Sequence, residues 1–372
     1  MKCKLSDICV FRKGKVDVSK LTLKTYISTE NMLPNKGGVT EASSLPTVQL
    51  TQEYKKGDIL VSNIRPYFKK IWQAKYDGGC SNDVLVFQGN SNIDGDFLYY
   101  ILANDDFFAY SMATSKGTKM PRGDKTSIMQ YEMPIFDIDT QRKIASVLRS
   151  LDEKIELNST INNNLEQQAQ TIYQQMFIDN PTPDWIEGSL SDIANITMGQ
   201  SPSGSSYNED RIGAIFFQGR AEFGFRFPTI RLYTTEPKRM AYANDILMSV
   251  RAPVGDLNVA HNDCCIGRGL AAIHSKTNHQ SFVLYTMFSL KKQLDVFNGE
   301  GTVFGSINRN SLNDMPILIP TDEQIEKFEL IVAPMDAAIR NNYDEICCLQ
   351  AVRDSLLPRL MSGELDVSNI DI

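Results

Sequence analysis

Residues 57–62 read Gly-Asp-Ile-Leu-Val-Ser, and residues 244–249 read Asn-Asp-Ile-Leu-Met-Ser. Further pairs of similar blocks follow in the same order, at 5–8 and 190–193, 97–100 and 282–285, 133–135 and 315–317, and 151–155 and 335–339. The offset between the two members hardly varies from pair to pair, and it is far longer than the repeat of a solenoid. Chance similarity would not keep its order over so many blocks. The sequence therefore predicts a tandem duplication of one domain followed by one helical segment.

The residue pattern changes once within each copy. The first part mixes β-rich runs, such as 83–87 and 214–217, with Gly, Asn and Ser turns, which is typical of a mixed domain of helices and strands. The remainder of each copy has a helical pattern. We predict an α+β protein with two tandem α/β domains at 1–136 and 181–319. A central helical spacer at 137–180 and a C-terminal helical spacer at 320–372 complete the predicted organisation.

The two helical segments carry apolar residues at alternating spacings of four and three, which is typical of helices that pack along a shared seam. The predicted seam residues are Leu148, Leu151, Ile155, Asn158, Leu165 and Ile172 in the first segment, and Val332, Met335, Ile339, Asn342, Ile346, Leu349 and Leu356 in the second. We predict an antiparallel coiled-coil spacer with pseudo-twofold symmetry. The alternative is two amphipathic helices that lie on separate cores.

Asn158 and Asn342 occupy the same seam position in the two copies of the repeat. A buried asparagine in a seam lowers stability but fixes the register, because only one alignment satisfies its amide. We therefore expect these two residues to pair. Pro334 lies inside the second segment and is expected to kink or break that helix.

Charge is distributed unevenly along the 372 residues, which have a net charge of −7. Residues 1–136 have a net charge of +4 and residues 187–319 of zero, whereas residues 137–186 carry −4 and residues 320–372 carry −7. We therefore expect the domains to contact nucleic acid and the acidic helices to meet a basic protein partner. The chain has no apolar run near the roughly 18 residues of a membrane span and no secretory signal, so a cytoplasmic location is expected.

Motifs of catalysis and metal binding are missing from the sequence. The seven cysteines form no C-x-x-C pair, and there are only three histidines. Neither the G-x-x-x-x-G-K-[ST] nucleotide loop nor the Asn/Asp-Pro-Pro-aromatic tetrad of adenine methyltransferases occurs. We expect neither a metal site nor catalysis by this chain.

Basic residues lie among turn formers and aromatic residues in a few segments of both domains. Lys and Arg in loops can bind phosphates, and Arg, Gln and Asn can read base edges. The candidates in the first domain are Arg12, Lys13, Lys15, Arg65, Tyr67, Lys69, Lys70, Lys116, Lys119, Arg122 and Lys125. Those in the second are Gln200, Ser201, Ser203, Arg220, Arg226, Arg251, Arg268, Asn308 and Arg309, with Gln218 in the same run as Arg220. For any one residue a solvated surface charge is the alternative. The clusters favour DNA, and their differences between the domains predict a bipartite, asymmetric target.

With these blocks the chain resembles the specificity subunits of Type I restriction–modification systems, over nearly its whole length. The resemblance rests on the blocks at 57–62 and 245–249, the latter followed by Arg-Ala-Pro-Val-Gly at 251–255. It also rests on Gly-Gln-Ser-Pro at 199–202, Pro-Thr-Asp-Glu-Gln at 320–324 and Leu-Pro-Arg-Leu-Met-Ser-Gly-Glu-Leu at 357–365. The chain differs at Thr140 and Gln141, where a Glu-Gln pair is usual.

The resemblance implies two target-recognition domains, each of which binds one half of a split double-stranded DNA sequence. It also implies two modification subunits, which would methylate an adenine with S-adenosylmethionine that they bind themselves. Restriction subunits, with ATP and Mg²⁺, would cleave unmodified DNA. This chain would then bind no cofactor of its own.

Two other classes of function remain open at this point. A protein–protein scaffold would use the coiled coil as its functional element and would show no salt-dependent affinity for DNA. An enzyme with an unrecognised site would show activity as an isolated chain.

Overall fold

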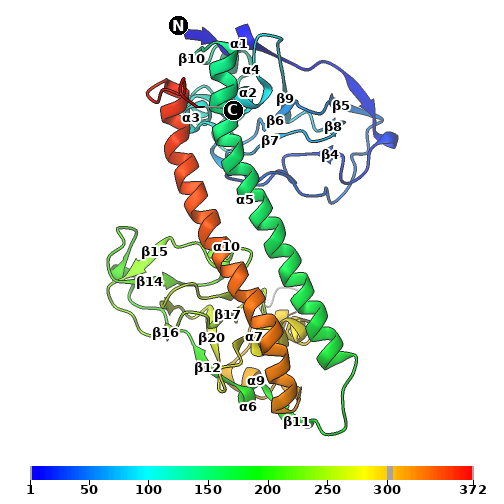
Figure 1. Cartoon of the computed structure of the whole chain (residues 1–372), viewed down its shortest axis with the longest axis vertical. Coiled ribbons are helices and arrows are strands. Elements are labelled where there is room, and N and C mark those ends of the chain that lie inside the picture. The colour runs from blue at the N-terminus through cyan, green and yellow to red at the C-terminus, as the bar shows by residue number, and fades with distance from the viewer. Residues whose placement is uncertain (1, 300–304, 371–372) are drawn as a thin grey trace. The chain divides into compact units, whose positions relative to one another are not determined.

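The computed structural model describes residues 2–299 and 305–370. The chain divides into two compact units, one made of Met1–Asn158 with Asp344–Ile372 and the other of Ser159–Tyr343 (Figure 1). The two long helices α5 (Ile138–Tyr173) and α10 (Asp322–Ser362) each contribute to both units. The globular part of each unit is called the first or the second domain below. The division thus cuts both helices, whereas the predicted segments kept each helix whole.

The first domain is built on an antiparallel sheet of four strands in the order β2–β9–β6–β7. These strands are β2 (Cys9–Phe11), β6 (Ile59–Ser62), β7 (Ile71–Gln73) and β9 (Val84–Gly89). Successive side chains of a strand point to opposite faces, so Leu85 and Phe87 of β9 join the core under the helices. Val84 and Val86 join a separate core on the other face. Both faces of this sheet are therefore covered.

Helices cover one face of this sheet and a second sheet covers the other. The helices are α2 (Gly95–Ala103) and α3 (Asp105–Ala113). The second sheet has the order β3–β5–β8–β4, with β3 (Lys15–Asp17), β4 (Tyr26–Ile27), β5 (Leu50–Tyr54) and β8 (Gly78–Cys80). Its strands β4 and β8 run parallel.

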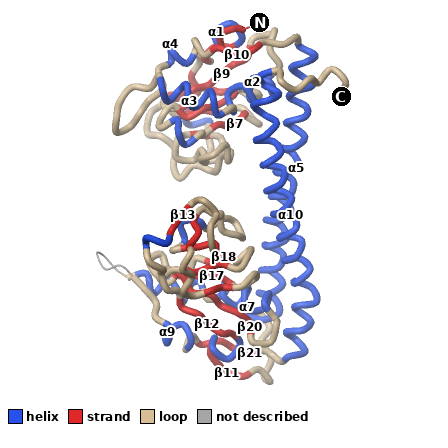
Figure 2. Tube along the Cα trace, turned by 90° about the vertical axis from the view of Figure 1, so that its left-hand side faces the viewer, coloured by secondary structure: helices blue, strands red, loops and turns tan. Residues whose placement is uncertain are grey.

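The second domain repeats this plan. Its central sheet has the order β12–β20–β17–β18, with β12 (Ala194–Met198), β17 (Ile246–Ser249), β18 (Leu257–Val259) and β20 (Leu270–Ser275). Its second sheet contains β13 (Tyr207–Asn208), β14 (Ala214–Phe217), β15 (Leu232–Thr234), β16 (Met240–Ala241) and β19 (Cys264–Ile266), and its helices are α7 (Gln280–Ser289) and α8 (Lys291–Asp295). Figure 2 shows strands β12, β17 and β20 beside helix α7. The matching strand orders of the two central sheets confirm the duplication that the sequence predicted.

Short elements close each copy in the same way. Strands β1 (Lys2–Lys4) and β10 (Glu132–Pro134) pair in the first unit, and β11 (Ile186–Ser189) and β21 (Pro316–Ile319) pair in the second. The repeated Leu-Ser-Asp-Ile block forms α1 (Leu5–Ile8) and α6 (Leu190–Ile193). Asp7 and Asp192 explain its recurrence, since each carboxylate accepts a hydrogen bond from a backbone N–H at the start of its helix, at 2.8 and 2.7 Å. Single-turn helices α4 (Lys125–Ile128) and α9 (Arg309–Asn313) precede the last strands.

The long helices run antiparallel within each unit. In the first unit Asp152 of α5 contacts Arg353 of α10 at 2.8 Å, and the later residue Asn158 donates to the earlier Glu345 at 2.7 Å. None of the thirteen predicted seam residues is exposed. Helix α10 continues through Pro334, so the predicted break does not occur. A proline leaves the carbonyl four residues earlier without its helical partner, and that residue, Leu330, lies on the exposed side of α10.

The predicted pairing of Asn158 with Asn342 is wrong. In the second unit Asn342 donates to the side-chain oxygen of Asn162 at 2.8 Å, and Asn162 donates to the carbonyl of Ile339 at 3.3 Å. The register is thus shifted by one helical turn from the predicted one. The shift is possible because Asn162 is itself a buried polar residue and can satisfy the same amide.

A tyrosine–aspartate pair holds each domain on a long helix. Tyr100 of α2 donates to Asp152 of α5 at 2.7 Å, and Tyr285 of α7 donates to Asp336 of α10 at 2.9 Å. All four residues lie in the repeated blocks 97–100 with 282–285 and 151–155 with 335–339, so the pair belongs to the duplicated unit. Both tyrosines are buried, which raises the pKa of each phenol and keeps it a donor. The pair fixes how each domain sits on its own helix.

Candidate nucleic-acid interface

The second domain has a hollow of about 390 Å³ that is rich in arginine. We call it the arginine hollow. It lies where three loops meet: the loop after β14, the loop after β17 and the loop before β20. Its lining includes Gln218, Arg220, Arg231, Arg251 and Arg268, with Glu222 as the acidic member. Such a concentration of cations and amides in loops matches the chemistry of DNA phosphates and base edges.

Direct backbone contacts hold the loops of the arginine hollow together. The N–H of Val250 donates to the carbonyl of Gly269 at 2.9 Å, and the N–H of Gly269 donates to the carbonyl of Gln218 at 3.2 Å. A Cβ at Gly269 would lie 2.8 Å from that Gln218 oxygen, and one at Gly199 would lie 2.2 Å from the carbonyl oxygen of Gly267. Only glycine allows backbones to approach so closely. These contacts fix the backbone positions from which the side chains of Gln218, Arg251 and Arg268 extend.

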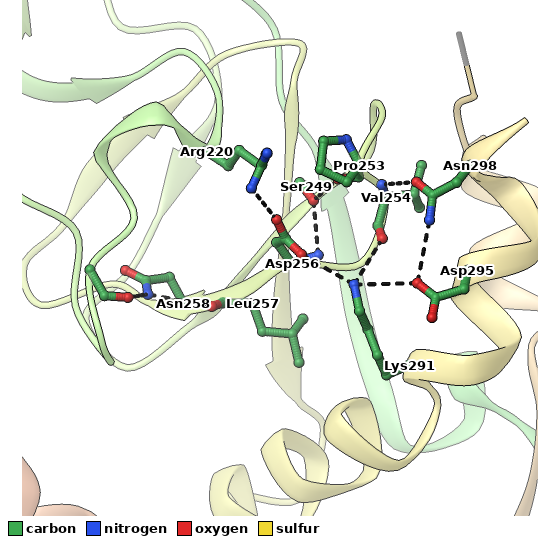
Figure 3. A network of polar contacts seen from close by, with 11 residues as sticks. Arg220, Ser249, Pro253, Val254, Asp256, Leu257, Asn258, Lys291, Asp295 and Asn298 are labelled. Atoms are coloured by element: carbon green, nitrogen blue, oxygen red, sulfur yellow. Dashed lines mark hydrogen bonds and ion pairs between the residues drawn. The ribbon is translucent and has the colours of Figure 1, made fainter. Parts of the chain in front are cut away.

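A polar network fixes the loop that carries Arg251 (Figure 3). The hydroxyl of Ser249 donates to the carbonyl of Pro253 at 2.7 Å and accepts from the N–H of Asp256 at 2.9 Å. Lys291 of α8 donates to the Asp256 carboxylate at 3.1 Å, and the same carboxylate pairs with Arg220. The loop is thereby fastened to α8 and to the neighbouring loop, as a rigid base for a recognition residue requires.

The four arginines of the hollow differ in their partners. Arg220 pairs with Asp256, and Arg231 pairs with Glu222 at 2.8 Å. Arg251 and Arg268 are exposed and form no ion pair with any residue in 2–299 or 305–370. Their guanidinium groups are therefore open to a ligand, and each can donate two parallel hydrogen bonds.

The first domain has a smaller hollow of about 210 Å³ beside β9. We call it the lysine hollow. Its polar lining is Arg12, Lys15, Gln52, Asn82 and Lys125. Arg12 makes a two-pronged ion pair with the buried Asp58, which raises the pKa of Arg12. Arg12 is thus held by the domain itself, while Lys15, Asn82 and Lys125 are exposed.

Other predicted residues of the first domain lie outside the lysine hollow. Lys13 and Lys119 are exposed, Arg65 is half-buried, and the Tyr67 ring is 49% exposed. The four remaining cations have partners: Lys69 with Asp105 at 2.8 Å, Lys116 with Asp124 at 2.7 Å, Arg122 with Asp83 at 3.1 Å, and Lys70 with the carbonyl of Thr29 at 2.6 Å. Several hydrogen bonds lower the pKa of Asp124 to about 2, and the one from Lys116 has the largest effect. These side chains would have to exchange partners in order to bind phosphates.

The predicted residues of the second domain that lie outside the arginine hollow have mixed roles. Ser201 accepts from the N–H of Arg268 at 3.2 Å and so supports the hollow from behind. Asn308 accepts from the N–H of Ser311 and begins α9. Gln200, Ser203 and Arg309 are exposed.

The prediction that Arg226 contacts DNA is wrong. Its side chain is 5% exposed and lies 3.1 Å from Glu166 of α5 and 3.3 Å from Asp336 of α10. It also donates to the hydroxyl of Tyr285 at 3.1 Å. Burial raises the pKa of Glu166, the nearby Asp336 raises it further, and Arg226 opposes both. Arg226 is a buried cation that fastens the loop between β14 and β15 to both helices.

The lining residues that were not predicted include Arg231, Gln52 and Asn82. Arg231 carries the same charge signal as Arg220 and could have been included on that ground. Gln52 and Asn82 are neutral and give no signal in a charge pattern. Their place in the lysine hollow depends on the fold of the second sheet.

The described ranges, 2–299 and 305–370, contain no cluster of three His, Cys, Asp or Glu side chains that could hold a metal ion. Within the same ranges, no helix is both long and apolar enough to cross a membrane.

Comparison with known proteins gives a consistent result. The family described as Type I restriction modification DNA specificity domain matches residues 1–167 and again residues 183–342. The putative type I restriction enzyme MjaX specificity subunit of Methanocaldococcus jannaschii is 29% identical, over 84% of this chain and 79% of that relative. The type I restriction enzyme HindI specificity subunit of Haemophilus influenzae is 24% identical, over 97% of this chain and 98% of that relative. The crystal structure of a Type-I restriction-modification system S subunit from M. genitalium shares the fold, with a TM-score of 0.62, 16% identity and coverage of 97% and 96%.

Proposed function

Because the chain belongs to the family of Type I restriction–modification DNA specificity proteins, we propose that it recognises one split DNA target, with half of the target read by each domain. The observation that carries the proposal is the pair of hollows. Each hollow lies beside the start of the equivalent strand, β9 in the first domain and β20 in the second, yet the side chains that line the two hollows differ. Two different sets of donors and acceptors select two different base sequences, so the target is bipartite and asymmetric.

The two long helices act as the spacer between the half-sites. They form an antiparallel coiled coil whose seam includes Leu148, Ile339 and the buried Asn162. All three are buried within their own unit. A continuous helix resists bending and compression, so its length sets the number of base pairs between the two recognised sequences.

The chain itself is non-catalytic and directs partner subunits. Modification subunits methylate an adenine with their own S-adenosylmethionine, and restriction subunits use ATP and Mg²⁺. The net charges of −4 and −7 in residues 137–186 and 320–372 suit the helices to a basic partner surface. Two modification subunits would match the twofold repetition of the chain.

Sequencing that detects methylated adenines tests the proposal. Cells express this chain with its neighbouring modification subunit, and the control cells express the modification subunit alone. We expect methylation at one split motif with a fixed gap, and none in the control. Unspecific methylation, or an unsplit motif, would contradict the reading of two half-sites. If the chain were only a protein–protein scaffold, it would form a stable complex with the modification subunit, but no DNA motif would be methylated.

A further inference from the structure

Sheet register shows which residues of the two hollows are equivalent. Ser62 of β6 pairs with Val84 of β9, and Ser249 of β17 pairs with Leu270 of β20. The serines close the repeated six-residue block, so Val84 and Leu270 are matching residues. Two residues before Val84 and two residues before Leu270 lie Asn82 and Arg268, which are therefore equivalent.

Both matching residues are placed to meet a ligand. Asn82 lines the lysine hollow and Arg268 lines the arginine hollow, and both are exposed. Each precedes an inner strand of its sheet by two residues. The same position in the fold therefore presents an amide in one domain and a guanidinium in the other.

A second matching pair follows from isolated bridges next to the same sheets. Ile64 bridges to Arg122 in the first domain, and Arg251 bridges to Ser306 in the second. Ile64 and Arg251 stand at the same distance after the serine that closes each repeated block, so they too are equivalent. The second domain thus has two exposed arginines where the first has an asparagine and an isoleucine.

We propose that Arg268 selects a guanine in one half-site and that Asn82 selects an adenine at the corresponding place in the other. This inference rests on the proposed function. An arginine fork donates to both O6 and N7 of guanine, whereas an asparagine amide pairs with N6 and N7 of adenine. Arg251 adds a second guanidinium to the same hollow, so the half-site read by the second domain contains guanine.

The anchoring of Arg268 supports base reading over loose phosphate contact. Its own N–H donates to the hydroxyl of Ser201 at 3.2 Å. The flanking residues Gly267 and Gly269 bond to the loop after β14, from Gly267 to Phe217 at 2.8 Å and from Gly269 to Gln218 at 3.2 Å. With the backbone held on both sides, binding does not require the loop itself to become ordered, so the entropy lost is that of the Arg268 side chain.

Reciprocal exchange of the two residues tests the inference. Genomic DNA from cells that express the wild-type chain, R268N or N82R with the modification subunit is sequenced for methylated adenine. R268N should reduce the preference for guanine at one position of one half-site by about tenfold, within the roughly 5–150-fold range of a good bidentate contact. N82R should replace an adenine preference in the opposite half-site. R239N, at an exposed arginine of the second domain that is not part of the hollow lining, should leave the motif unchanged.

The outcomes separate the two levels of the proposal. A wild-type chain that directs no split motif would contradict the proposed function itself. A split motif without guanine in either half-site would overturn the inference and leave the function standing, and this test needs no variant. So would an R268N motif identical to the wild-type one, or changes by both variants in the same half-site. Fluorescence of Trp185, which lies in the second unit, checks that R268N is folded.

Discussion

Replacing Arg226 with methionine should lower the free energy of unfolding of the second unit by about 3–5 kcal/mol, the effect of removing one partner from a buried ion pair. The variant leaves Glu166 and Asp336 near one another without the cation that lies 3.1 and 3.3 Å from them. The chain has two tryptophans, Trp72 in the first unit and Trp185 in the second. Urea unfolding followed by fluorescence in a W72F background therefore reports on the second unit.

The effect of R226M should depend on pH. Burial and Asp336 already raise the pKa of Glu166 above its ordinary value of 4.5, and Arg226 opposes that rise. Without Arg226 the pKa rises further, so above pH 4.5 the folded variant binds more protons than the unfolded chain. Stability then increases as the pH falls, and the deficit relative to the wild type should be smaller at pH 5 than at pH 8.

A control for R226M comes from the same loop. Arg231 is 55% exposed and its partner Glu222 is 11% exposed, so R231M should lower the stability less than R226M, in which the lost cation is itself buried. Equal losses in R226M and R231M, or a deficit in R226M that grows as the pH falls, would contradict the buried ion cluster.

Replacing Gly199 with alanine should destabilise the second unit by an amount near the upper end of the roughly 1–3 kcal/mol that overpacking costs. The new Cβ would lie 2.2 Å from the carbonyl oxygen of Gly267 and 2.8 Å from that of Ile266. Both neighbours are backbone atoms that cannot rotate away. The loop that carries Arg268 must then move, so methylation of the split motif should also fall.

Gly204 provides the matched control for this substitution. It lies in the same segment, and a Cβ there would meet no atom within 4 Å. G204A should keep both the unfolding free energy and the methylated fraction. If G199A unfolds at the same urea concentration as G204A, the proposed close contact between Gly199 and the backbone of Gly267 would be contradicted.

Much of the fold could be predicted because its signals are local or repeated. The block at 57–62 and its copy at 244–249 form the matching strands β6 and β17, and heptad spacing located both long helices. The helix register could not be predicted. Asn158 and Asn162 are both buried seam residues, so two alignments one turn apart satisfy the same pattern, and only the packing of the whole unit selects one.

The candidate interface could be predicted only in part. The charge pattern identified Arg220, Arg251 and Arg268, which line one hollow. The same pattern misplaced Arg226, because its burial depends on Glu166 and Asp336 from two distant helices. It also missed Asn82, whose neutral amide gives no signal in a charge pattern, and only the strand register identifies it as the residue equivalent to Arg268.

Binding of the chain, in complex with its modification subunit, to four DNA duplexes tests the central claim most directly. The duplexes carry both half-sites of the split motif, only one, only the other, or neither. We predict that scrambling either half-site weakens binding at least tenfold, since each lost base contact costs about 1–3 kcal/mol, and that affinity falls steeply with added salt. Equal affinity for all four duplexes, or binding that is indifferent to salt, would contradict the reading of DNA by both domains.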